Sequence, residues 1–179
     1  SFLTLRGLWL GPLLMERQGW SLVASGHLAL VVSLISLVSP GLFGRMDPGP
    51  LRRRRLLVTT TSIIALLYAA LGLLHTGWLN VALIIVIVIV SGGSVLQYAH
   101  VRSSYPPEAT GRAMALLTMA MFLGAALMQW LTGLMASWAT RYGFDPFAAV
   151  MLGIALMLCL GAAAFQMLPV SERLQRTGA

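Results

Sequence analysis

Long apolar runs constrain this chain more than any other feature. Five of them are about 20 residues long, which is the length that an α-helix needs to cross the hydrocarbon core of a bilayer. Only 9% of the residues are charged, against about 25% in a soluble globular domain, so a soluble fold is excluded. The expected spans are residues 21–43, 56–74, 81–99, 113–138 and 147–168.

The run at residues 81–99 contains the sequence LIIVIVIV, whose β-branched residues would indicate a buried strand in a water-soluble protein. Its length and its position among other spans decide for a helix instead. Residues 113–138 are rich in small side chains, which indicates close packing between membrane helices. The predicted fold is therefore all-α, a polytopic helical membrane protein with one domain over residues 1–179.

Residues 2–14 form a further apolar segment that is too short for a complete span. Either the chain begins partway through a membrane helix, or the segment lies in the membrane interface; Ser1 in place of a methionine favours a truncated or processed start. If the segment ends near Glu16 at the membrane surface, Arg6 lies about 15 Å deeper, at about 1.5 Å per residue. A charge at that depth should face water, a counter-charge or a ligand rather than lipid.

The twelve basic residues are all arginines, and they are distributed unevenly among the polar breaks. Arginines that flank membrane helices stay overwhelmingly on the cytoplasmic side. If successive breaks face opposite sides, nine arginines share one side, while Arg17 and Arg141 are on the other and Arg6 lies within the first segment. We therefore expect the loops at residues 44–55 and 101–111, and the C-terminus, in the cytoplasm. The nine are Arg45, Arg52, Arg53, Arg54, Arg55, Arg102, Arg112, Arg173 and Arg176.

Other functional classes find little support in the residues. The net charge of +7 is explained by topology, so nucleic acid is not an expected partner. The sequence Ser91-Gly92-Gly93-Ser94 could be imagined as a nucleophile with His27 as its base, but no carboxylate within a span would orient them, and helix packing is favoured. The three histidines lack the helical i, i+4 spacing of a metal site. We expect no enzymatic activity, no metal and no cofactor.

Three motifs add information to the apolar pattern. The sequence Gly7-Leu8-Trp9-Leu10-Gly11-Pro12 precedes a polar turn, and the stretch Gly41–Arg55 combines glycines, Asp47 and a basic cluster. Tyr105-Pro106-Pro107-Glu108 comes shortly before Gly111-Arg112-Ala113. With these motifs the chain resembles the C-terminal half of a major facilitator superfamily transporter. Residues 2–14 would be a truncated helix seven, and the five full spans would be helices eight to twelve.

The resemblance implies a transporter of two six-helix halves around a midplane site, with this chain supplying one half. It also implies that helices seven, eight, ten and eleven line the pathway, while nine and twelve lie outside. The pathway candidates are then Arg6, Trp9, His27, Gln97, Tyr98, Thr118 and Gln129. Other roles stay open: Trp9 as an interfacial aromatic, Thr118 bonded to its own backbone, and Tyr98 with His100 at the inner boundary.

Two further groups of residues follow from the same resemblance. A cytoplasmic loop for gating and topology would comprise Gly44, Asp47, Arg52, Arg53, Arg54 and Arg55. A motif at the start of helix eleven would comprise Pro106, Gly111 and Arg112.

The implied function is secondary active transport of a small solute by alternating access, in the bacterial inner membrane. The expected partners are the lipid bilayer, a substrate that the sequence does not identify, and either a missing N-terminal half or a second copy of this chain. A half-size transporter that works as a homodimer and a non-transporting membrane scaffold or assembly factor stay open. No Asp or Glu lies within a span, so proton coupling would need a carboxylate from the other half or His27.

Overall fold

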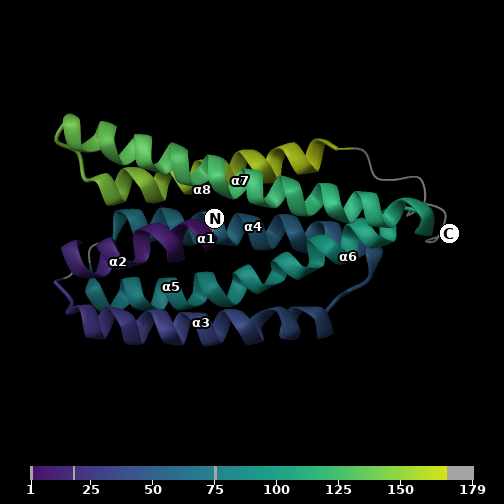
Figure 1. Ribbon diagram of the computed structural model, residues 1–179, viewed down its shortest axis with the longest axis horizontal. Coiled ribbons are helices and arrows are strands. Elements are labelled where there is room, and N and C mark those ends of the chain that lie inside the picture. The colour runs from purple at the N-terminus through teal and green to yellow at the C-terminus, as the bar shows by residue number, and fades with distance from the viewer. Residues whose placement is uncertain (1, 18, 75, 169–179) are drawn as a thin grey trace.

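The structure is a computed structural model that describes residues 2–17, 19–74 and 76–168, and the regular elements in these ranges are helices. The long helices lie side by side in an elongated bundle (Figure 1). Within the described ranges, five helices are long and apolar enough to cross a membrane, counting α5 and α6 as one helix. The all-α membrane fold is confirmed. The long helices are α3 (Leu22–Arg45), α4 (Pro50–Leu73), α5 (Gly77–Ser91), α6 (Val95–Ser104), α7 (Pro107–Arg141) and α8 (Pro146–Met167).

The first segment packs against the bundle with one face buried and the other exposed. Its side chains Leu5, Leu13 and Leu14 are buried in the common core. The indole Nε1 of Trp9 donates to Thr132 Oγ1 on α7 at 3.2 Å. The segment therefore belongs to the fold. It consists of α1 (Phe2–Thr4), the π-helical turn η1 (Leu5–Trp9), α2 (Leu10–Pro12) and the π-helical turn η2 (Leu13–Arg17).

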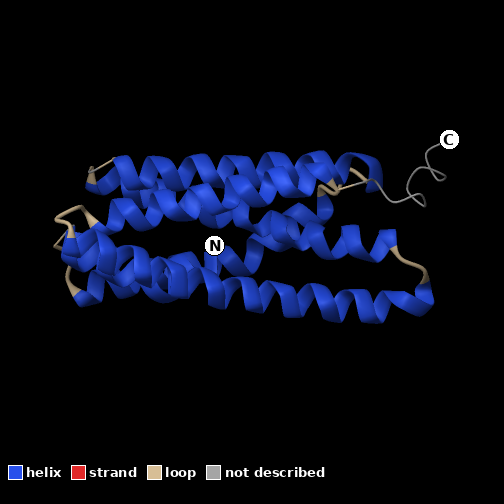
Figure 2. Ribbon diagram, turned by 90° about the horizontal axis from the view of Figure 1, so that it is seen from above, coloured by secondary structure: helices blue, strands red, loops and turns tan. Residues whose placement is uncertain are grey.

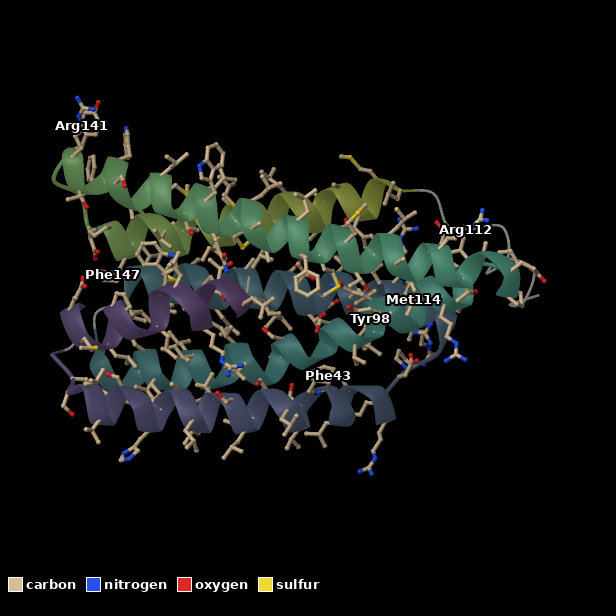
Figure 3. The ribbon with its side chains drawn as sticks, in the orientation of Figure 1. Phe43, Tyr98, Arg112, Met114, Arg141 and Phe147 are labelled. Atoms are coloured by element: carbon tan, nitrogen blue, oxygen red, sulfur yellow. The ribbon has the colours of Figure 1, made fainter. Side chains whose placement is uncertain are left out.

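The connections between the long helices gather at the two ends of the bundle (Figure 2). Figure 3 shows Arg112 near one end of α7 and Arg141 at the other. We call the end with Arg112, which also contains the α3–α4 and α6–α7 connections, the arginine end. The expected polar tail with Arg173 and Arg176, as well as His75, lies outside the described residues.

Helices extend further at the arginine end than the expected spans. Arg52, Arg53, Arg54 and Arg55 were expected in a loop, but α4 begins at Pro50 and contains all four in its first turns. Proline is favoured at the first helical position, because its missing N–H would have no helical partner there. A helical start gives each arginine a fixed direction around α4, which a loop would not.

Glycines mark two of the close contacts between helices. Helix α4 lies against α8, where a Cβ added to Gly72 would be 3.1 Å from Met151 Cβ, and α3 crosses the chain at Gly92, directly after α5, where an added Cβ would collide with Ser39. The contact with Ser39 confirms that Gly92 serves helix packing, as expected from the sequence. By contrast, a Cβ on Gly124 of α7 would meet nothing within 4 Å, so the expected close packing through Gly124 is not present among the described residues.

Candidate functional site

The helix formed by α5 and α6 is interrupted just past its middle by a 3-10 turn, η3 (Gly92–Ser94). Glycines destabilise a helix by about 1 kcal/mol each relative to alanine, and here they also allow α3 to approach. An added Cβ on Gly92 would lie 2.7 Å from the carbonyl carbon of Ser39, and one on Gly93 would lie 3.4 Å from the Phe43 ring. Ser39 Oγ donates to the carbonyl oxygen of Ile89 at 3.1 Å. The crossing with α3 thus coincides with a tightened turn in a helix that otherwise continues through the membrane span. We call this 3-10 turn the helix break, and α5, η3 and α6 together the broken helix.

A cavity of about 540 Å³ lies beside this break, between the broken helix, α4 and α7. The broken helix contributes Ser91, Ser94, Gln97 and Tyr98, and α4 contributes Thr60 and Thr61. Helix α7 contributes small and apolar side chains. Its Ala120, Gly124 and Ala125 border the cavity, so their small size leaves room for it. None of the described residues that line it is charged. The lining on α7 is Ala120, Met121, Phe122, Gly124, Ala125 and Met128.

The polar side chains of this central cavity differ in their availability. Thr60 Oγ1 and Thr61 Oγ1 each donate to a carbonyl of the preceding turn of α4 at 2.8 Å, so their protons are engaged. Ser91 Oγ is buried without a hydrogen-bond partner in the described part of the chain. A buried hydroxyl without a partner costs about 1–3 kcal/mol, which a bound solute or water would recover. The broken helix therefore presents the hydrogen-bonding groups that a ligand can use.

The structure brings two of the seven pathway candidates together in the cavity, Gln97 and Tyr98. Arg6, His27 and Gln129 are exposed on the surface of this chain and do not line the cavity. Thr118 Oγ1 donates to Met114 O at 3.0 Å, which is the backbone bond that remained open as an alternative.

Trp9 lies instead in a contact cluster away from the arginine end. Its ring meets Phe147 of α8 edge-on, with centroids 6.0 Å apart. Figure 3 shows Phe147 toward the Arg141 end of the bundle. With its hydrogen bond to Thr132, Trp9 holds the first segment against α7 and α8.

Sequence reasoning missed the contribution of α4. The resemblance placed helices nine and twelve outside the pathway, but α4 and α8, which correspond to them, both reach the cavity. The signal that could have identified α4 is the polar run Thr59-Thr60-Thr61-Ser62 in an otherwise apolar span.

A second cluster of polar groups lies at the arginine end, around Arg53. The Arg53 side chain is only 7% exposed, and its Nε donates to Asp47 Oδ1 at 3.0 Å while Nη2 donates to Asp47 Oδ2. Its Nη1 donates to Ala99 O at 2.9 Å and to Ser103 Oγ at 3.0 Å on α6. The hydrogen bonds from Arg53 lower the pKa of Asp47, against the opposing effect of partial burial. Arg53 therefore connects the α3–α4 loop, α4 and α6.

The other candidates at this end take different positions. The Nη2 of Arg54 donates to the carbonyls of Phe165 at 3.0 Å, Gln166 at 2.9 Å, and Leu168, at the end of α8. Pro106 precedes the first residue of α7. The other candidates at this end are exposed, namely Gly44, Arg52, Arg55, Gly111 and Arg112. Within the described ranges, no group of three or more His, Cys, Asp or Glu side chains could hold a metal ion.

The fold and the central cavity define a polytopic helical membrane protein with an uncharged cavity that is partly open along α7. The family model of the Major Facilitator Superfamily matches residues 7–128, which is more than half of the chain, so the chain belongs to this family of membrane transporters. No curated protein and no solved structure matches the chain.

Proposed function

We propose that this chain forms one half of a secondary active transporter and that the central cavity binds the transported solute. The helix break carries the proposal, because a 3-10 stretch in the middle of a long helix often marks a functional hinge. Ser91, Ser94, Gln97 and Tyr98 place hydroxyl, amide and phenol groups around such a break. A solute bound there would be exposed to each side in turn as the two halves rock against each other.

The surface of α7 supports the presence of a second half. No residue in the most apolar 18-residue window of α7 is buried, whereas 39% of the corresponding windows of α4 and α8 are buried. Gln129 is exposed on α7, and Arg6 is exposed on the first segment. A guanidinium at the membrane centre costs at least about 2.5–3.5 kcal/mol in lipid. We infer that protein covers this surface, supplied by another six-helix half, and a crosslinked homodimer of this chain would show that a second copy takes that place.

Transport can be tested with two neighbouring alanines on α7. Proteoliposomes that contain the assembled transporter, with both halves present, are incubated with a defined mixture of small polar solutes, and the trapped solutes are identified by mass spectrometry. Ala125 lines the cavity, so Ala125→Phe should reduce the uptake of the transported solute by about tenfold or more, equivalent to about 1.4 kcal/mol of lost binding. Ala126 does not line the cavity, so Ala126→Phe is the matched control. Equal uptake by the parent and both variants would show that the cavity is not the route.

We also propose that the arginine end faces the cytoplasm, because flanking arginines stay on that side. Glu108 and Arg141 are exposed near opposite ends of α7. In intact cells, an impermeant thiol reagent should label Arg141→Cys and leave Glu108→Cys unlabelled, in a background in which Cys159 is replaced by Ser. Labelling of Glu108→Cys alone would reverse the orientation, and labelling of both would exclude a spanning α7.

A further inference from the structure

A second cavity, of about 310 Å³, lies next to the central cavity on the side of the arginine end. We call it the end cavity. It is formed by α4, α6, α7 and α8, and it shares Leu57, Thr61 and Gln97 with the central cavity. Its volume is at the lower end of the range of about 300–1,000 Å³ that small-molecule sites occupy. Apart from these three shared residues, the proposed transport mechanism does not use this space.

The apolar part of the end cavity lies between α4 and α8. Leu57 and Val58 line it from α4, and Gly161, Ala162 and Phe165 line it from α8. A Cβ added to Gly161 would meet nothing within 4 Å, so the absence of a side chain there contributes to the open space. This part of the cavity suits the hydrocarbon body of a ligand.

His100 provides a polar group without a partner in the same cavity. Its Nδ1 is buried and makes no hydrogen bond within the described part of the chain. The imidazole meets the ring of Phe165 edge-on, with centroids 5.9 Å apart. An imidazole nitrogen that has lost water without gaining a partner is unfavourable, and a ligand with a polar head would remove that cost.

Positive charge is in excess around His100. The Arg54 guanidinium lies over the ring of Phe165, 5.5 Å from its centroid. This is the same ring that His100 contacts. Arg54 donates to backbone carbonyls and has no carboxylate partner among the described residues, whereas Arg53 is paired with Asp47. A negatively charged head is therefore favoured over a neutral or a positive one.

We propose that the end cavity binds a single-chain carboxylate amphiphile of the fatty-acid type. The carboxylate lies toward His100 and Arg54, and the hydrocarbon body lies between Leu57, Val58 and Ala162. The end cavity adjoins the solute cavity, but photolabelling measures binding without transport, so the failure of this proposal and that of the proposed transport function are distinguishable.

Photolabelling with a diazirine derivative of decanoic acid tests the site, using the full chain in nanodiscs of zwitterionic lipid. Peptide mass spectrometry should find the label at residues 57–58 and 161–165. Gly161→Leu fills the cavity and should reduce labelling by about tenfold, the ratio that corresponds to about 1.4 kcal/mol of binding free energy. Ala164 is exposed on α8 and does not line the cavity, so Ala164→Leu should label like the parent. Unchanged labelling of Gly161→Leu would overturn the proposal.

Two further comparisons test the chemistry of the head group. His100→Phe keeps a ring of similar shape but removes the nitrogen, and it should weaken labelling, as should replacing the probe by its diazirine alcohol analogue. Equal labelling by acid and alcohol would overturn the assignment of a carboxylate. Nanodiscs that contain an anionic phospholipid should not suppress labelling, and complete suppression would show that a lipid headgroup is the ligand instead. If Gly161→Leu does not fold, Val58→Phe fills the same space from α4, and its unchanged labelling would be equally decisive.

Discussion

Helices α4 and α7 are both apolar enough to cross a membrane, but they have opposite environments. Helix α4 lies against α5, α6 and α8, and its Tyr68 and Leu71 are completely buried. Helix α7 contacts mainly α8 and α6, and Leu116, Phe122, Leu127 and Trp130 along it are more than 45% exposed. Apolar composition therefore predicts that a helix is in the membrane, but it does not predict whether lipid or protein surrounds it.

The difference between the two helices also explains their roles. Helix α4 supplies anchoring contacts at both ends, through Arg53 to α6 and through Gly72 to α8. Helix α7 supplies one wall of the central cavity and leaves the remainder of its surface open. A rigid core on one side and an open wall on the other is the arrangement expected of one half of a two-part transporter. Substitutions that compare α4 with α7 test this division.

The largest expected effect comes from glycines on the two helices. Gly72→Leu would force a side chain into the α4–α8 contact, where Met151 Cβ and Ala148 O lie 3.1 and 3.3 Å from an added Cβ. Overpacking of this kind costs about 3 kcal/mol at the upper end of its usual range. Gly124→Leu on α7 enters open space and should not destabilise the fold, since replacing a glycine within a helix gains up to about 1 kcal/mol of helix propensity.

Thermal unfolding of the detergent-solubilised variants measures this difference. Gly72→Leu should unfold several degrees below Gly124→Leu, at about 2–4 °C per kcal/mol. Equal unfolding temperatures would mean that α4 and α7 are equally free of close neighbours, and the comparison between them would fail.

A smaller effect is expected from arginines near the beginnings of the same helices. Arg53→Gln leaves Asp47 without its ion pair and removes the guanidinium that donates to Ala99 O and Ser103 Oγ. Removing one member of a buried pair costs about 3–5 kcal/mol, and because the Asp47 side chain is 23% exposed we expect about 2 kcal/mol. Arg112→Gln on α7 alters an exposed side chain and should have an effect within about 0.5 kcal/mol. Urea unfolding monitored by tryptophan fluorescence would show a lower midpoint for Arg53→Gln alone.

The sequence predicted the helices and the chemistry of single loops better than contacts between distant segments. The five spans followed from run length, and the family resemblance already placed Asp47 and Arg53 in one loop group, where the structure pairs them. The contacts of Arg54 with Phe165 and of Trp9 with Thr132 join residues more than 100 positions apart. Such contacts depend on how each helix is rotated about its axis.

Helix rotation is difficult to predict here because membrane helices are apolar on their lipid-facing and protein-facing sides alike. Hydrophobic periodicity, which identifies the buried face of a soluble helix, is therefore weak. This explains why Thr60 and Thr61 of α4 were missed, although they line the central cavity. It also explains why the small residues of α7 were assigned to packing, although Ala120, Gly124 and Ala125 line the same cavity.

The smallest expected effect concerns the pH dependence of the Asp47–Arg53 pair. The pKa of Asp47 in the folded protein lies below its ordinary value of 3.8, because Arg53 donates hydrogen bonds to the ionised carboxylate. A lowered pKa means that the pair contributes its full stabilisation above pH 3.8 and loses it as the pH falls through the folded pKa. The informative quantity is a difference between variants, because effects of pH that the variants share then cancel. The unfolding temperature of the parent minus that of Arg53→Gln should be constant above about pH 5 and should decrease below it, since Asp47 then becomes protonated. The difference in unfolding temperature between the parent and Arg112→Gln should show no such decrease.

A difference between the parent and Arg53→Gln that does not change with pH would contradict this prediction. It would mean that Arg53 stabilises the fold through Ala99 and Ser103 rather than through Asp47, and the bond between the loop and α4 would have no part in the rigidity of that side of the bundle.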